Sequence, residues 1–132
     1  MKKVIFISFI FIALISCKKT EFSPIGPTDV RVRNLSDVTF TEVTVNTSGG
    51  TNSVGTIAPG LVSEYFRFEK AYSKAEISAK INGVTFSTET VDYTYLDYKG
   101  QVKMTYEVEI SDLNNKVLKI KNVILEEALH LK

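Results

Sequence analysis

The chain has 132 residues, of which 16 are basic and 15 acidic, and a net charge of +1. This length supports one domain with its own core rather than two, and the near-neutral charge excludes the general basic face that binds nucleic acid. A single cysteine excludes an intramolecular disulfide, so we expect packing alone to stabilise the fold.

The chain begins with the parts of a secretory signal. Lys2 and Lys3 are basic, residues 4–15 form an apolar run, and Ser16 is a small residue directly before Cys17. This order of parts is typical of a cleaved export signal. A transmembrane helix needs about 20 apolar residues, which is more than this run supplies. We therefore expect cleavage rather than a membrane span.

Leu14, Ile15, Ser16 and Cys17 resemble the lipobox of bacterial lipoproteins of the Gram-negative type. The resemblance implies that the signal, residues 1–16, is removed and that the sulfur of Cys17 is diacylated, with its new amine often acylated too. One acyl chain holds a protein weakly on a membrane, whereas two or three hold it firmly. An ordinary signal peptide that leaves a free thiol is the alternative. The resemblance implies nothing about activity.

Residues 17–27 are expected to be the lipidated cysteine and a flexible tether, because two prolines and a glycine interrupt any regular element. The ten residues after the cysteine can extend to roughly 30 Å. By the same resemblance, inner-membrane lipoproteins often carry Asp after the cysteine and some surface-exported ones an acidic cluster, whereas this chain has Lys18 and Lys19. We expect a cell-envelope protein at the outer membrane, facing the periplasm. The cell surface is the alternative.

From residue 28 onward, apolar and polar residues alternate with the period of strands that bury one face. Val30 and Val32, for example, alternate with arginines. In residues 38–46 the alternation slips by one residue at Thr41 and Glu42. The slip predicts a β-bulge.

The clearest hairpin lies in the middle of the chain. Residues 75–81 alternate and are followed by Asn82 and Gly83, the pair that best supplies the two positive φ angles of a type I′ turn. After the turn, Val84 and Phe86 are expected to resume the buried face.

Residues 102–110 form the strongest strand pattern, and residues 117–125 a last strand with a phase change near Lys121. Seven or eight short strands without a convincing helix predict an all-β fold, an antiparallel β-sandwich over residues 28–127 followed by a C-terminal tail at 128–132. The strand pattern resembles that of immunoglobulin-like or transthyretin-like domains. A small up-and-down β-barrel is the alternative.

Catalytic chemistry finds little support in the sequence. His130 is the only histidine and lies near the end, where chains tend to fray. An acylated Cys17 has no thiolate to act as nucleophile or metal ligand. We expect no catalytic residue, no metal and no cofactor, and hence not an enzyme. Glu89, Asp92 and Asp97 leave one alternative, a hydrolase or ligand carrier acting on an envelope carbohydrate or lipid.

The stretch from Asp92 to Gly100 holds a cluster of tyrosines. Tyr93, Tyr95 and Tyr98 lie close to Asp97, and loop tyrosines often contact proteins and sugars. These four residues are a candidate partner-binding loop. The interpretation we favour over binding is that Tyr93 and Tyr95 close the end of the sandwich, with tyrosine hydroxyls bonded to backbone in the loop. We expect a lipid-anchored, noncatalytic binding or structural module that meets an envelope protein or glycan at high local concentration.

Overall fold

The structure is a computed structural model, and it describes residues 26–128. The expected signal, Cys17, most of the tether and residues 129–132 lie outside the described residues. The described chain forms eight strands: β1 (Thr28–Asn34), β2 (Phe40–Asn46), β3 (Thr51–Ile57), β4 (Phe66–Phe68), β5 (Glu76–Ile81), β6 (Val84–Ser87), β7 (Val102–Asp112) and β8 (Val117–Ala128). Over this range there is no helix with the length and apolar character needed to cross a membrane.

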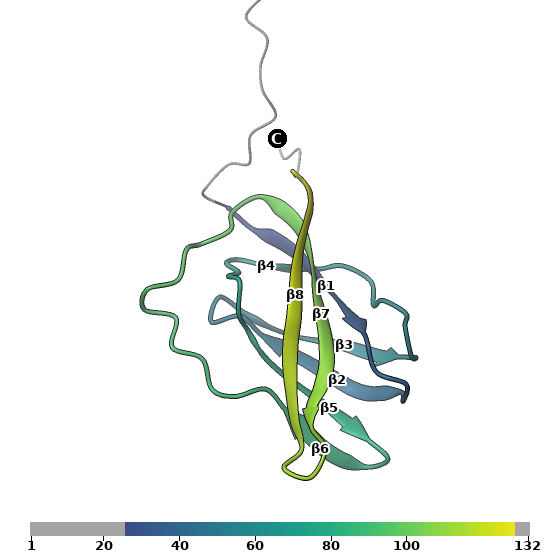
Figure 1. The fold of residues 1–132 in the computed structure, drawn as a ribbon. Coiled ribbons are helices and arrows are strands. Elements are labelled where there is room, and N and C mark those ends of the chain that lie inside the picture. Colours follow the sequence, from purple (N-terminus) through teal and green to yellow (C-terminus); the bar gives the residue numbers. More distant parts are fainter. Residues whose placement is uncertain (1–25, 129–132) are drawn as a thin grey trace, which may run out of the picture.

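The strands form one sheet in the order β3-β2-β5-β6-β8-β7-β1-β4. An isolated bridge between Gly49 and Lys70 links the loop after β2 to the residues after β4, so the sheet curls into a nearly closed barrel (Figure 1). The predicted all-β fold is confirmed, and this shape is consistent with a flattened sandwich or a small barrel.

The pairing is mixed rather than purely antiparallel. β1 pairs in parallel with β7, and β6 meets β8 in parallel. Parallel neighbours need long connections, and here most of the chain separates β1 from β7. Local alternation carries no signal for such distant pairing.

The slip predicted at Thr41 and Glu42 is a β-bulge in β2. The register shifts between Phe40 and Val43 against β3, and between Thr41 and Thr44 against β5. Glu42 has a φ of 48°, in the left-handed region that few residues other than glycine adopt. The extra residue allows Phe40 and Val43 both to face the core, where each is fully buried.

The hairpin between β5 and β6 has the predicted turn, since Asn82 and Gly83 have φ values of 52° and 81°. Phe86 is buried as expected, but Val84 is 41% exposed, so its predicted burial is wrong. The reason lies in the neighbouring strand. β8 meets β6 only at Ser87, and no described strand pairs with that side of β6 next to the turn.

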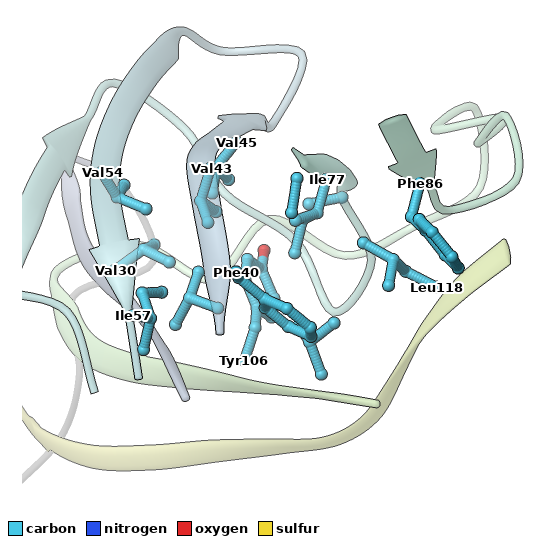
Figure 2. Packing of buried hydrophobic residues seen from close by; sticks show 14 of the residues in the cluster. Val30, Phe40, Val43, Val45, Val54, Ile57, Ile77, Phe86, Tyr106 and Leu118 are labelled. Atoms are coloured by element: carbon cyan, nitrogen blue, oxygen red, sulfur yellow. The ribbon is translucent and has the colours of Figure 1, made fainter. Parts of the chain in front are cut away.

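One cluster of buried side chains fills the barrel. Figure 2 shows Phe40 and Tyr106 within this cluster, and Phe86 beside Leu118 towards β6 and β8. The largest fully buried side chains are Tyr106, Phe40, Phe68, Ile57, Ile77, Met104, Leu118, Val30, Val32, Val43, Val45 and Val102. Alternate residues of β7 enter the cluster, whereas β8 adds one fully buried residue, Leu118. Further along β8, Leu125 is 42% exposed.

A buried amide at the end of β1 joins this strand to the connection before β2 and to the end of β3. The Asn34 side chain donates to the carbonyls of Val38, at 2.7 Å, and Ile57, at 2.9 Å, and accepts the backbone N–H of Ser36 at 2.8 Å. Asn34 is fully buried, so these bonds replace the water contacts that its amide loses on folding.

Candidate functional site

The long connection between β6 and β7, residues 88–101, lacks regular secondary structure and runs around one side of the barrel (Figure 1). Backbone bonds hold it at both ends. At its start, Thr88 and Ile77 exchange two hydrogen bonds of 2.9 Å, one through the Thr88 hydroxyl. At its end, the Lys99 N–H donates to the Ala71 carbonyl at 2.9 Å. We call residues 88–101 the tyrosine segment.

Two of its tyrosines brace the segment from within. The Tyr93 hydroxyl donates to the Asn46 carbonyl at 3.2 Å. The Tyr98 hydroxyl lies 2.5 Å from the Gly26 carbonyl and accepts the Gly26 N–H at 3.0 Å. The ring of Tyr72 lies near both. Its centroid is 5.2 Å from that of Tyr93 and 6.3 Å from that of Tyr98. Tyr93 and Tyr98 therefore close the end of the fold. The packing interpretation is confirmed for Tyr93 and wrong for Tyr95, which is 93% exposed; Tyr98 takes the second position instead.

Burial raises the pKa of the Tyr93 hydroxyl, and the nearby carboxylate of Glu76 raises it further. That carboxylate also accepts the backbone N–H of Val91 at 3.0 Å. A neutral, partly buried Tyr93 is suited to bracing the segment rather than to reacting with a ligand.

Tyr95 is placed differently from its neighbours. It is 93% exposed, at the tip of the segment, and Asp97 is exposed beside it. Local hydrogen bonds order the tip. The Asp92 carboxylate accepts the backbone N–H of Thr94 at 3.0 Å and the Thr94 hydroxyl at 2.6 Å. The structure therefore divides the four predicted residues into two braces, Tyr93 and Tyr98, and two exposed groups.

A shallow hollow of about 520 Å³ lies between the start of the tyrosine segment and the first residues of β8. Glu89 and Asp92 line it, and Lys119 lines the side formed by β8. Asp97, expected to join these carboxylates, is not among the lining residues. Hydrogen bonds from the Thr94 side chain and backbone lower the pKa of Asp92. This shift is opposite to the raised pKa that a catalytic proton donor requires.

Tyr72 also belongs to the tyrosine cluster, but it was not among the predicted binding residues. It lies sixteen positions before the start of the tyrosine segment. No local pattern points to it. Within residues 26–128, no three His, Cys, Asp or Glu side chains gather closely enough to hold a metal ion.

The outer face of β1, β7 and β8 carries a polar network. Arg31 pairs with Glu126 at 2.9 Å and lies 4.7 Å from the ring centroid of Tyr65, whose hydroxyl also donates to Glu126. Burial alone would raise the pKa of the Glu126 carboxyl, but the hydrogen bonds from Tyr65 and Thr105 and the charge of Arg31 together lower it. Further ion pairs join Arg33 to Glu107 at 3.3 Å and Arg67 to Asp29 at 2.7 Å. These hydrogen bonds and ion pairs tie the strands together.

Together these features define an all-β domain with a braced, tyrosine-tipped connection. The chain matches no protein-family model, and no curated protein is similar to it. Among solved structures, it is similar to the NMR structure of a protein from Eubacterium rectale, with 15% sequence identity and a TM-score of 0.48. The match covers 78% of this chain and 91% of the other.

Proposed function

We propose that this chain is a lipid-anchored, noncatalytic binding module of the cell envelope, and that it contacts a protein or glycan partner through the tip of the tyrosine segment. One observation carries the proposal. Tyr95 is 93% exposed while the segment around it is fixed at several points. A large aromatic side chain in water supplies the kind of contact area that dominates many interfaces.

The bracing matters because ordering a loop on binding weakens affinity, by about 0.5–1.5 kcal/mol for each side chain that becomes immobilised. Here the bonds of Tyr93 and Tyr98 to backbone order the segment beforehand. A partner that stacks on Tyr95 meets a surface that is already shaped. Asp97, exposed nearby, adds a charge that can orient the partner.

The proposed anchor fits the place of this surface in the fold. The described chain starts at Gly26, which is bonded to Tyr98, and only two residues of sequence separate Tyr98 from Tyr95. The binding tip therefore lies near the point where the tether enters the domain. Acyl chains on Cys17 would keep this tip close to the membrane, and we propose the periplasmic face of the outer membrane, with the cell surface as the alternative.

The anchor is tested by mass spectrometry of the full chain extracted from bacterial membranes. We expect a product that begins at Cys17 and carries the added mass of acyl chains. An unmodified, freely soluble product would refute the anchor and leave the binding surface to be judged separately.

The binding surface is tested by photocrosslinking in intact cells. A photoreactive phenylalanine analogue replaces Tyr95 in one variant and Leu113 in another, since Leu113 is also exposed, at 67%, on a different loop. We expect a discrete crosslinked species from position 95 alone. Identical crosslinking from both positions, or none from position 95, would contradict the proposal.

A matched pair of substitutions separates recognition from packing. Tyr95→Ala should abolish the crosslink seen at a neighbouring reporter position, Thr94, and leave the melting temperature unchanged, because the exposed ring supports no core contact. Tyr98→Phe should lower the melting temperature by removing the bonds to Gly26. A lower melting temperature for Tyr95→Ala would show that the Tyr95 ring stabilises the fold by packing.

A hydrolase or ligand carrier acting on an envelope carbohydrate or lipid is the second candidate, favoured by the carboxylates of Glu89 and Asp92 in the hollow. Its test is the double variant Glu89→Gln with Asp92→Asn, compared with the natural chain for hydrolysis or binding of isolated envelope glycans and lipids. A loss confined to the double variant would favour this function over the noncatalytic one.

A further inference from the structure

The turn between β5 and β6 presents an asparagine followed by a glycine to the solvent. Asn82 and Gly83 are both exposed, and no described atom beyond its chain neighbours lies within 4 Å of the place where a Cβ of Gly83 would stand. Asparagine is thermolabile because its side-chain amide can react with the backbone nitrogen that follows it. Glycine leaves that nitrogen unobstructed, since it has no side chain.

The other asparagines of the chain are protected from this reaction. Five of them make side-chain hydrogen bonds: Asn34, Asn46, Asn52, Asn115 and Asn122. The side chains of Asn82 and Asn114 make none with residues 26–128. Asn114 is exposed as well, but the residue after it carries a side chain. Among the described asparagines, Asn82 alone combines exposure, an unbonded side chain and a following glycine.

The hairpin around this turn is weakly held on one side. β5 and β6 share four residue pairs, whereas the other side of β6 meets β8 only at Ser87. Val84, next to the turn, is 41% exposed. Few buried contacts and an unpaired side are features of segments that open locally at a low cost in free energy. Local opening gives the Asn82 side chain the freedom to rotate towards the Gly83 nitrogen.

We propose that Asn82 is a site of spontaneous covalent modification, which deamidates it and converts part of it to isoaspartate. The Gly83 nitrogen attacks the side-chain carbonyl carbon of Asn82 and forms a C–N bond. The side-chain nitrogen leaves as ammonia, together with the proton of the Gly83 N–H, and a succinimide ring remains. Water then opens the ring. Cleavage at the side-chain carbonyl gives aspartate, and cleavage at the main-chain carbonyl gives isoaspartate. No atom is oxidised or reduced.

The two products affect the hairpin differently. Aspartate before glycine also supports a type I′ turn, so this product leaves the hairpin in place. Isoaspartate carries the main chain through its side-chain carbons, which inserts an extra methylene into the two-residue turn. The pairing of Ile81 with Val84 then no longer fits the turn, and the buried side chains of Ile81 and Phe86 lose their fixed positions.

The change reaches the start of the tyrosine segment. Thr88 follows β6 directly and exchanges two hydrogen bonds with Ile77 of β5. A hairpin whose strands have shifted cannot keep both bonds. Isoaspartate at position 82 therefore loosens one of the two ends at which the tyrosine segment is held. This inference is independent of what the segment binds.

The test is ageing of the purified full chain for several weeks at mildly alkaline pH, followed by peptide mapping with mass spectrometry. We expect Asn82 to gain the mass difference between an amide and an acid severalfold faster than Asn114, and an isoaspartyl methyltransferase to label the Asn82 peptide. Asn114 is the matched control within the same chain. An intact Asn82, or equal conversion at Asn114, would overturn the proposal.

Two variants separate the reaction from its effect on the fold. Asn115→Gly places a glycine after Asn114 and should raise the conversion of Asn114 severalfold, while the melting temperature shows that the variant is folded; an unchanged rate would refute the role of the following glycine. Freshly purified Asn82→Asp should melt at the temperature of the natural chain, whereas the isoaspartyl form isolated by chromatography should melt lower. Equal melting of these two proteins would refute the effect on the hairpin.

Discussion

Tyr106 offers the sharpest test of how the core is built. Its ring is fully buried in β7, and its hydroxyl donates to the Tyr72 carbonyl at 2.6 Å. Tyr106→Phe keeps the ring and removes the donor, which leaves the carbonyl without its partner. Such a change lowers the free energy of unfolding by about 1–3 kcal/mol. In a domain of this size, each kcal/mol lowers the melting temperature by roughly 4–8 °C.

The same substitution has a defined pH dependence. Burial, with a smaller contribution from nearby Tyr93, raises the pKa of the Tyr106 hydroxyl above its usual value near 10. In the unfolded chain that hydroxyl ionises near pH 10, while in the folded chain it stays protonated. The stability from Tyr106 is therefore present below pH 10 and is lost as the pH rises above it, by about 1.4 kcal/mol per pH unit. Phenylalanine has no such loss.

Urea unfolding of the natural chain and Tyr106→Phe at pH 8, 10 and 11 measures both effects. We expect the variant to be less stable at pH 8 and its deficit to shrink by about 1 kcal/mol at pH 11. Tyr65 and Tyr93 also have raised pKa values, but they are present in both proteins and cancel. A deficit that is constant with pH would refute the buried, neutral state of Tyr106.

Three further changes test other parts of the fold. Asn34→Ala should lower the free energy of unfolding by about 1–3 kcal/mol, because the buried Ile57 carbonyl loses its side-chain donor and the Ser36 N–H loses its acceptor, while the Val38 carbonyl keeps the Ser36 hydroxyl; calorimetry checks this, and an unchanged melting temperature would contradict this role of Asn34. Gly49→Ala should destabilise the chain, because its Cβ would lie 2.7 Å from the backbone nitrogen of Lys70; an unchanged melting temperature would show that the two segments separate without strain. Glu126→Gln should lower stability at pH 7 by at most about 1 kcal/mol. Since the pKa of Glu126 is lowered on folding, that difference should shrink as the pH falls below the ordinary glutamate pKa of about 4.3 and the folded-state carboxyl becomes protonated, and a difference that does not shrink on acidification would disprove the ionic contribution.

Local features of the fold could be predicted because the signals lie in neighbouring residues. The phase slip at Thr41 and Glu42 gave the bulge, and Asn82 with Gly83 gave the hairpin. Val84 was misjudged because its burial depends on how far β8 extends alongside β6. That distance is a property of the assembled sheet and not of the alternation.

Less of the candidate site could be predicted from the sequence. The tyrosines of residues 92–100 stood out by composition, but nothing local separates Tyr95, which is exposed, from Tyr93 and Tyr98, which brace the segment. Their partners, Asn46 and Gly26, lie 47 and 72 residues away in sequence. The parallel pairing of β1 with β7 brings Gly26 to Tyr98, and the pairing of β2 with β5 places Asn46 opposite Glu76, next to the segment that carries Tyr93. Alternation within single strands cannot report either pairing.

That parallel pairing also decides how the domain would respond to mechanical load. β1 and β7 start at the same end of the sheet, with Asp29 facing Lys103. With the tether anchored and a partner bound to the tyrosine segment, as proposed above, a load would pull the two strands apart from that end, and their hydrogen bonds would break one after another. The contact between Tyr98 and Gly26 spans that end and takes the tension first.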